Sequence, residues 1–137
     1  MLDVVKAFDR VWHEGLIYKL IQQGLEREMI QLIVSFITNR TFAVSIGEDQ
    51  SSIHTINAGV PQGSILGPIL YLLYVAEFPR MPIDKNHFLG CYADDTALAV
   101  KSANANYAVS KLQDFMTDVE AWCTKWRILI NAQKSQL

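Results

Sequence analysis

Residues 88–100 read Phe-Leu-Gly-Cys-Tyr-Ala-Asp-Asp-Thr-Ala-Leu-Ala-Val, two apolar runs joined by a pair of aspartates. The runs predict two short strands, and the acid pair between them predicts the turn of a hairpin. Taken alone, Asp94-Asp95 is an ordinary turn sequence, because aspartate tolerates the backbone of a turn. The same carboxylates are also suitable ligands for a hard divalent cation. The stretch by itself leaves a structural and a functional interpretation open.

A third aspartate lies in another apolar segment. Residues 2–5 read Leu-Asp-Val-Val, which predicts a short strand with one acid inside it. A carboxylate is rarely buried without a partner or a metal ion, although Asp3 could also be a strand-end cap. If the strands of Asp3 and Asp94 lie side by side, their carboxylates converge and can hold two cations about 3.5–4 Å apart, as in phosphoryl transfer. Adjacent strand residues point to opposite faces, so Asp94 and Asp95 are equivalent only if the turn redirects one of them.

The rest of the chain shows a mixture of helical and alternating patterns. Helices are predicted where apolar residues recur at helical spacing: residues 13–23, Leu25 to Asn39, residues 69–78 and Ala105 to Trp126. Gly67 is expected to cap the third of these, which is apolar nearly all round and should be buried. Strands are predicted at residues 2–5, 41–46, 51–56 and 128–130, besides the two within 88–100. This order predicts an α+β fold with one antiparallel sheet packed on helices.

Composition restricts the class of protein. The chain has 137 residues, of which 50% are hydrophobic and 19% charged, so it can bury a core and is not a disordered tail. Its 12 basic and 14 acidic residues give a net charge of -2, whereas a domain that binds nucleic acid by itself is usually basic. Cys91 and Cys123 show no metal-binding spacing, which favours a reduced, intracellular setting. The longest apolar stretch, residues 65–76, is too short to span a bilayer, so no membrane association is expected.

Three motifs occur in a fixed order. They are Leu-Asp-Val-Val-Lys-Ala-Phe-Asp at residues 2–9, Gly-Val-Pro-Gln-Gly-Ser-Ile-Leu-Gly-Pro at 59–68 and Tyr-Ala-Asp-Asp at 92–95. Together they closely resemble the palm of a reverse transcriptase of the non-LTR retrotransposon kind, and residues 7–16 are similar to the jockey-type elements of arthropods. Trp126, Asn131 and Lys134-Ser135 resemble the next motif of that family. The resemblance implies that residues 1–137 form a partial reverse transcriptase domain, a palm with catalytic motifs A to D, with fingers and thumb largely absent.

The resemblance also implies a reaction. It is RNA-directed DNA polymerisation, in which a primer 3′-hydroxyl attacks the α-phosphate of a deoxynucleotide and releases pyrophosphate. Asp3 and Asp94 correspond to the family's metal-ligating aspartates and Asp95 to the third, supporting acid, so two Mg²⁺ ions are implied. Phe8 and Ala93 favour this deoxynucleotide chemistry over an RNA-dependent RNA polymerase.

Five further residues match substrate-binding positions of the family. Phe8 would exclude a 2′-hydroxyl by bulk, Gln62 and Gly63 would lie near the incoming nucleotide, Tyr92 would lie near the primer end, and Lys134 would protonate or shield the pyrophosphate. Four of them have a plainer alternative: core packing for Phe8, a simple loop position for Gly63, a half-buried strand position for Tyr92 and solvation for Lys134.

Structural roles are predicted for the other polar and aromatic candidates. Asp9 is expected to lie outside the metal centre and to cap the helix that starts at His13. No metal-ligand spacing relates the three histidines, and two tryptophans continue the apolar stripe of the longest helix. Core or structural positions are therefore expected for His13, His54, His87, Trp122 and Trp126.

The implied partners are an RNA template, a DNA primer or target, deoxynucleotides and the remainder of a retrotransposon polyprotein, including fingers, thumb and endonuclease. Basic surfaces in those parts would explain the acidic balance of this chain. We therefore expect the chain to be inactive in isolation, with apolar surface exposed where those parts would dock. The alternative function is that of a non-catalytic remnant of a mobile element that binds RNA or protein.

Overall fold

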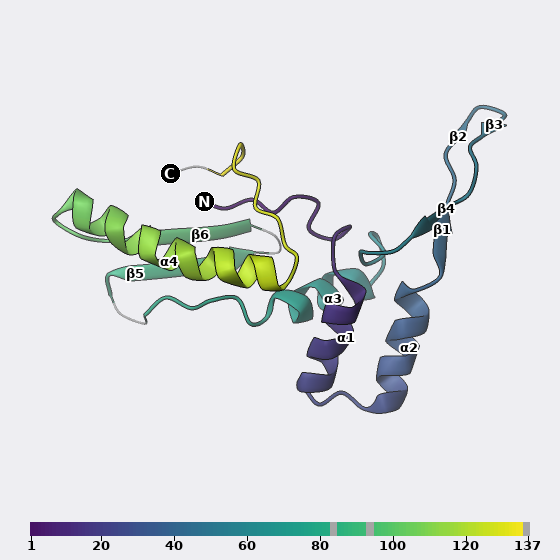
Figure 1. The fold of residues 1–137 in the computed structure, drawn as a ribbon, viewed down its shortest axis with the longest axis horizontal. Coiled ribbons are helices and arrows are strands. Elements are labelled where there is room, and N and C mark those ends of the chain that lie inside the picture. Colours follow the sequence, from purple (N-terminus) through teal and green to yellow (C-terminus); the bar gives the residue numbers. More distant parts are fainter. Residues whose placement is uncertain (83–84, 93–94, 136–137) are drawn as a thin grey trace. The chain divides into compact units, whose positions relative to one another are not determined.

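The chain folds into two compact units, each of which is considered by itself (Figure 1). The computed structural model describes residues 1–82, 85–92 and 95–135. The hairpin unit is Phe8–Tyr74, and the sheet unit combines Met1–Ala7 with Val75–Leu137. Helices and small antiparallel sheets occur together, which confirms the predicted α+β class, but the named strands of the described residues form three two-stranded sheets instead of the one sheet predicted.

Two antiparallel helices begin the hairpin unit. They are α1, His13–Gln22, and α2, Arg27–Ile37, in good agreement with the predicted ranges. Gly24 follows α1 with a φ of +77°, a conformation that glycine adopts without strain, and the chain then turns into α2. The two helices pack against each other, and Lys19 of α1 lies over the Tyr74 ring of α3, Leu66–Val75. The core of this unit consists of Val11, Leu16, Leu20, Ile33, Ile37, Val60, Leu70, Tyr71 and Tyr74.

The predicted hairpin follows α2 and forms the arm of this unit in Figure 1. Strand β1, Arg40–Phe42, pairs with β4, His54–Ile56, and β2, Ser45–Ile46, pairs with β3, Asp49–Gln50. Between the two short ladders the Val44 N–H donates to the Ser51 hydroxyl over 2.9 Å. A side chain therefore replaces a ladder partner there, which divides the expected pair of long strands into four short ones.

Helix α3 corrects three predictions, which concern its ends, the role of Gly67 and its burial. It starts at Leu66 and ends at Val75, three residues earlier at each end than predicted, and Gly67 lies inside it rather than capping it. The start moves because the Ser64 hydroxyl accepts the Gly67 N–H over 2.9 Å and so supplies the cap. Complete burial was also wrong, since Ile69 and Leu72 are about half exposed.

The sheet unit is built on one hairpin. Strand β5, His87–Tyr92, pairs antiparallel with β6, Asp95–Val100, which confirms the two strands predicted within residues 88–100. Leu2 bridges Thr96 of β6, and Val4 bridges Ile130, so the N-terminal segment lies between β6 and the C-terminal segment. The segments 2–5 and 128–130, which were predicted as strands, therefore form isolated bridges and not continuous ladders. Residues 2–5 pair with β6 only at Leu2 and with the C-terminal segment only at Val4.

Helix α4, Ala105–Lys125, covers one face of this sheet (Figure 1). The Asn104 side chain caps its first turn by accepting the Tyr107 N–H. The core between helix and sheet has Met81, Phe115, Val119 and Cys123 at its centre, with Leu2, Phe78, Leu89, Leu98, Val100, Leu112, Met116, Trp122, Ile128 and Ile130 around them. Trp126 is also buried, so both tryptophans take the predicted core positions. Among the helices of the described residues, none is long and apolar enough to cross a membrane.

Candidate active site

Asp3 lies on the strand next to Asp95. Leu2 and Thr96 exchange two backbone hydrogen bonds, of 2.8 and 3.2 Å, and this pair is antiparallel. Asp3 follows Leu2 and Asp95 precedes Thr96, so the register places the two aspartates opposite each other. Opposed residues at such a position have Cα atoms about 4.5 Å apart and side chains on one face. The expected side-by-side arrangement of the two acidic segments is therefore present in the sheet unit.

The other edge of the Asp3 backbone is held by the C-terminal turn. The Asn131 N–H donates to the Asp3 carbonyl over 2.8 Å, and the Asp3 N–H donates to the Ser135 hydroxyl over 3.3 Å. Ser135 in turn donates its hydroxyl to the Asn131 carbonyl, which closes the turn. Asp3 is thus bonded to the C-terminal turn through its own N–H and carbonyl, while its neighbour Leu2 is bonded to β6.

Alternation along the strand decides where that side chain lies. Leu2 packs in the core beneath α4, and Val4 bridges Ile130, which belongs to the same core. Side chains of adjacent strand residues point to opposite faces, so the Asp3 carboxylate lies on the face away from α4. Asp95 shares this face because its neighbour Thr96 is buried and it is itself exposed. Two carboxylates on an open sheet face are the kind of donor set that a hard divalent cation prefers.

The third predicted ligand, Asp94, lies outside the described residues. Tyr92 is the last residue of β5, is paired with Asp95 and is 84% exposed, so it is not the half-buried strand residue of the plainer interpretation. Among the residues that are described, no group of three or more His, Cys, Asp or Glu side chains is gathered as a metal site. Of the three aspartates predicted as ligands, Asp3 and Asp95 are within the described residues.

Lys134 lies in the same C-terminal turn that holds Asp3. Its N–H donates to the Asn131 carbonyl over 3.2 Å, and its side chain is exposed. The turn thus brings the backbone of Lys134 close to that of Asp3 in the sheet unit, and the exposure leaves both interpretations of this lysine open.

The hairpin unit holds the remaining predicted residues around the glycine loop, residues 57–65 between β4 and α3. The Gly59 N–H donates to the Val11 carbonyl and the Val60 N–H to the Phe8 carbonyl, each over 2.8 Å. Gly59 has a φ of +87°, and a Cβ there would lie 2.7 Å from the Asp9 carbonyl oxygen. Only glycine therefore allows the loop to approach the segment before α1 this closely.

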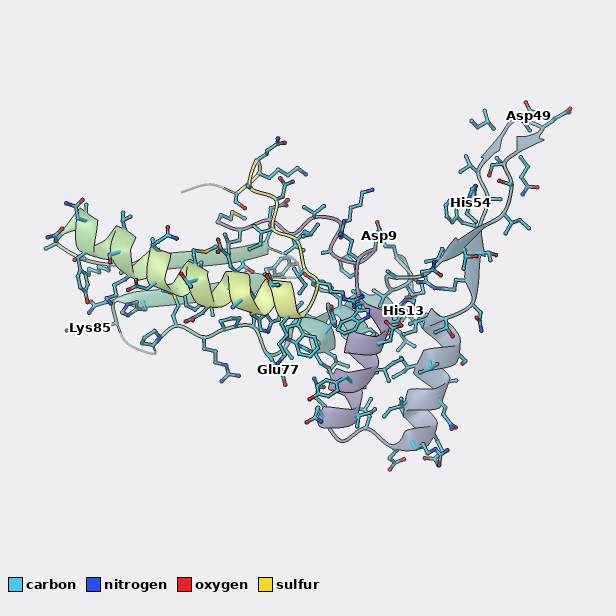
Figure 2. The ribbon with its side chains drawn as sticks, in the orientation of Figure 1. Asp9, His13, Asp49, His54, Glu77 and Lys85 are labelled. Atoms are coloured by element: carbon cyan, nitrogen blue, oxygen red, sulfur yellow. The ribbon has the colours of Figure 1, made fainter. Side chains whose placement is uncertain are left out.

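Two side chains hold the carbonyl of Gly59. A ring nitrogen of His13, Nε2, lies 2.8 Å from that oxygen, and Arg40 donates to it from Nη2 over 2.5 Å. The Arg40 Nε also donates to the Ile37 carbonyl over 2.9 Å, which ties the group to the end of α2. His13 is buried at the start of α1 (Figure 2), and its predicted structural role is confirmed by this contact.

Asp9 does not cap α1, because the N-cap of that helix is Trp12 and makes no side-chain capping bond. Its carboxylate instead accepts a hydrogen bond from the Gln62 amide, with Nε2 and Oδ1 2.6 Å apart. The capping prediction was wrong because the partner of Asp9 lies 53 residues away, where local sequence carries no signal for it.

Phe8 and Gly63 flank this contact. The Phe8 ring lies 4.8 Å from that of Tyr71 in α3, tilted by 32°, and is half-buried. This packing agrees with the plainer interpretation of Phe8 and leaves part of its ring accessible. Gly63 has a φ of +79° with nothing within 4 Å of a would-be Cβ, so its requirement for glycine comes from the backbone rather than from crowding.

The two units therefore divide the predicted residues between them. Asp3, Tyr92, Asp95 and Lys134 belong to the sheet unit, whereas Phe8, Gln62 and Gly63 belong to the hairpin unit. Sequence reasoning missed contacts across long separations, namely those of Asp9 with Gln62, of Arg40 with the Gly59 carbonyl, and of the Asn131 N–H and the Ser135 hydroxyl with the Asp3 backbone.

Comparison with known proteins identifies the family. A family model for reverse transcriptase (RNA-dependent DNA polymerase) matches residues 1–137. The chain is 41% identical over 138 residues to the RNA-directed DNA polymerase from mobile element jockey of Drosophila melanogaster, covering 97% of this chain and 15% of that protein. It is 40% identical over 136 residues to the probable RNA-directed DNA polymerase from transposon X-element of the same species, covering 98% and 15%.

A further relative, the probable RNA-directed DNA polymerase from transposon BS of Drosophila melanogaster, is 37% identical over 139 residues, again 98% of this chain and 15% of the relative. The chain thus spans about 15% of the length of these curated relatives. The predicted resemblance to the jockey-like, non-LTR kind is confirmed by these matches. The chain belongs to the reverse transcriptase (RNA-dependent DNA polymerase) family.

Proposed function

We propose that this chain is the palm of an RNA-directed DNA polymerase of a non-LTR retrotransposon, which transfers a nucleotide from a deoxynucleoside triphosphate to a primer 3′-hydroxyl. The observation that carries the proposal is the register that sets Asp3 opposite Asp95 on the sheet face away from α4. The family match over residues 1–137 and the names of the relatives support the same reaction.

Asp3, Asp94 and Asp95 would hold two Mg²⁺ ions. Carboxylate oxygens from adjoining strands fit a hard cation that also binds water and substrate phosphates. When bound, such ions activate an attacking hydroxyl and stabilise the leaving oxygen. The contribution of the chain is to fix the Asp3 backbone, which bonds to the C-terminal turn while its neighbour Leu2 bonds to β6, so that the carboxylate would start from a defined position.

The substrate contacts are assigned to both units. Tyr92, exposed at the end of β5, is placed against the primer terminus, and Lys134, exposed in the C-terminal turn, shields the pyrophosphate. The half-buried Phe8 ring excludes a 2′-hydroxyl, and its contact with the Tyr71 ring holds it in position. Gln62 and Gly63 contact the incoming nucleotide, with the open space around Gly63 allowing close approach.

The template, the primer and the rest of a polyprotein complete the activity. A chain with 12 basic and 14 acidic residues has no excess of positive charge for a nucleic-acid backbone. The relatives are several times longer, and parts outside the matched region would supply that charge. We therefore propose that the chain polymerises DNA only within the longer protein.

Primer extension tests this function. The chain is assayed alone and as a chimaera in which it replaces the matching 138 residues of the jockey polymerase. The assay contains an RNA template, a DNA primer, deoxynucleotides and Mg²⁺. We expect extension by the chimaera, abolition by Asp94→Ala, and unchanged extension by Asp118→Asn, an exposed acid on α4. A folded chimaera that does not extend, beside an active parent, would favour the non-catalytic remnant instead.

A further inference from the structure

We propose that Asp9 is a positioning residue that fixes the side-chain amide of Gln62 in one orientation at the glycine loop. The proposal rests on the proposed polymerase function, in which Gln62 contacts the nucleotide. Its basis is the hydrogen bond from Gln62 Nε2 to Asp9 Oδ1, 2.6 Å long, which joins the segment before α1 to the loop before α3.

The contact belongs to an ordered junction rather than to two loose surface chains. Two backbone hydrogen bonds of 2.8 Å hold the loop to the segment of Asp9, one on each side of that residue, at Phe8 and Val11. His13 and Arg40 hold the Gly59 carbonyl at the same place. Because the backbones are fixed, the Gln62 side chain is within reach of Asp9 without an additional ordering of the loop.

The chemistry of the pair determines which way the amide faces. An ionised carboxylate only accepts hydrogen bonds, whereas a glutamine amide has one donating and one accepting end. Asp9 therefore draws the NH₂ group of Gln62 toward itself and leaves Oε1 as the free end. This oxygen accepts, so it suits a hydroxyl or N–H of the nucleotide's sugar or base and not a triphosphate oxygen, which also accepts.

The position of the pair makes it suitable for mutation. Asp9 and Gln62 are both exposed, so their hydrogen bond contributes little to the stability of the fold and its variants should fold. Asp49 offers a matched control, since it is an exposed aspartate of the same unit at the far end of the hairpin (Figure 2).

The test measures deoxynucleotide incorporation by the jockey chimaera carrying single variants and a swapped pair at positions 9 and 62. Asp9→Ala should raise KM about three- to tenfold, the loss of one hydrogen bond, with kcat within about twofold because Asp9 touches no reacting atom. Gln62→Glu should raise KM further, because it opposes two carboxylates. The swapped pair Asp9→Asn with Gln62→Glu should return KM toward the parent value. It restores a donor facing a carboxylate, keeps a free accepting oxygen at position 62 and leaves the net charge unchanged.

The outcomes separate the two proposals. If Asp9→Ala has the same KM as Asp49→Ala, or if the swapped pair is no better than Gln62→Glu alone, Asp9 does not position Gln62. An inactive parent chimaera would count against the polymerase function, and the placement of Asp9 is then decided by cross-linking. Cysteines at positions 9 and 62, with Cys91→Ser, should be joined by a short bismethanethiosulfonate, whereas cysteines at 49 and 62 should not. Failure of the first pair to cross-link in the folded chimaera would overturn the positioning role.

Discussion

Replacing Gly59 by alanine should separate the glycine loop from the segment before α1. Gly59 has a φ of +87°, and its would-be Cβ lies 2.7–2.8 Å from the carbonyl oxygen, carbonyl carbon and Cα of Asp9. These atoms are backbone, so no side-chain rotation relieves the contact. The loop must move instead, and its movement would break the 2.8 Å bonds of Gly59 to Val11 and of Val60 to Phe8.

The expected cost has two parts. An L-residue in the left-handed region costs about 1–2 kcal/mol. The two lost backbone hydrogen bonds add about 1 kcal/mol each, and the separated carbonyl of Gly59 also leaves His13. Gly59→Ala should therefore destabilise the hairpin unit by about 3–5 kcal/mol. Gly24→Ala is the matched control, because Gly24 has a φ of +77° with nothing within 4 Å of a would-be Cβ, so only the first cost applies.

Urea unfolding combined with hydrogen exchange of peptides from the hairpin unit measures both variants. Exchange should accelerate in residues 8–12 and 57–65 for Gly59→Ala, and the free energy of unfolding should fall about 2–3 kcal/mol further than for Gly24→Ala. Equal losses in the two variants would show that the close approach to Asp9 does not constrain the loop, and the explanation of why a glycine is needed at position 59 would fail.

Three other predictions concern the core and the substrate. Burial, followed by the charge of Glu120, raises the pKa of Cys123 to about 11, so alkylation at pH 8 should modify Cys91 and spare Cys123. Equal alkylation rates of the two thiols would contradict this raised pKa. Between pH 9 and 11 the folded state keeps a proton on Cys123 that the unfolded state loses, so the free energy of unfolding should decline as the pH rises from about 9 to about 11. Phe115→Ala should cost about 3–5 kcal/mol in urea unfolding by leaving a cavity under α4, and a loss below about 1 kcal/mol would mean that the core is not packed as described. Phe8→Val in the chimaera should reduce discrimination against ribonucleotides about tenfold or more, measured as a ratio of kcat/KM values, whereas an unchanged ratio would assign Phe8 to packing alone.

Local patterns predicted the elements well where a single periodicity dominates. Helices α1, α2 and α4 lie close to their predicted ranges because apolar residues mark one face of each. The hairpin of β5 and β6 was equally clear from its two apolar runs, although Asp95, which was predicted in the turn, is the first residue of β6 and pairs with Tyr92. In α3 the same reasoning failed at the ends. An apolar helix has no polar face that marks where it begins, and in α3 the start is set by the cap at Ser64. A serine three residues before the Gly-Pro pair is a sequence signal that could have predicted this start.

Long-range polar partners could not be predicted from one sequence. Asp9 stands next to a helix start, and the local rule for such an aspartate is capping, yet its partner comes from a loop 53 residues away. The same holds for Arg40, which lies at the start of a strand and reaches the Gly59 carbonyl. Both side chains bond to groups whose positions exist only after the chain has folded, so no spacing in the sequence encodes them.

The position of Asp3 shows why the motif around it is apolar. A metal-binding carboxylate must be held accurately, and accuracy comes from the backbone, not from the carboxylate's own flexible bonds. Leu2 packs against the core beneath α4 and bridges Thr96, and the half-buried Val4 bridges Ile130 on the opposite edge, so the residue between them has little freedom. The alternation that buries its neighbours also sends the Asp3 side chain to the open face. Under the proposed function, Asp3 lies between apolar residues for a geometric reason: the bridges of Leu2 and Val4 hold the backbone, and the Asp3 carboxylate is left on the open face, where it would bind a metal ion.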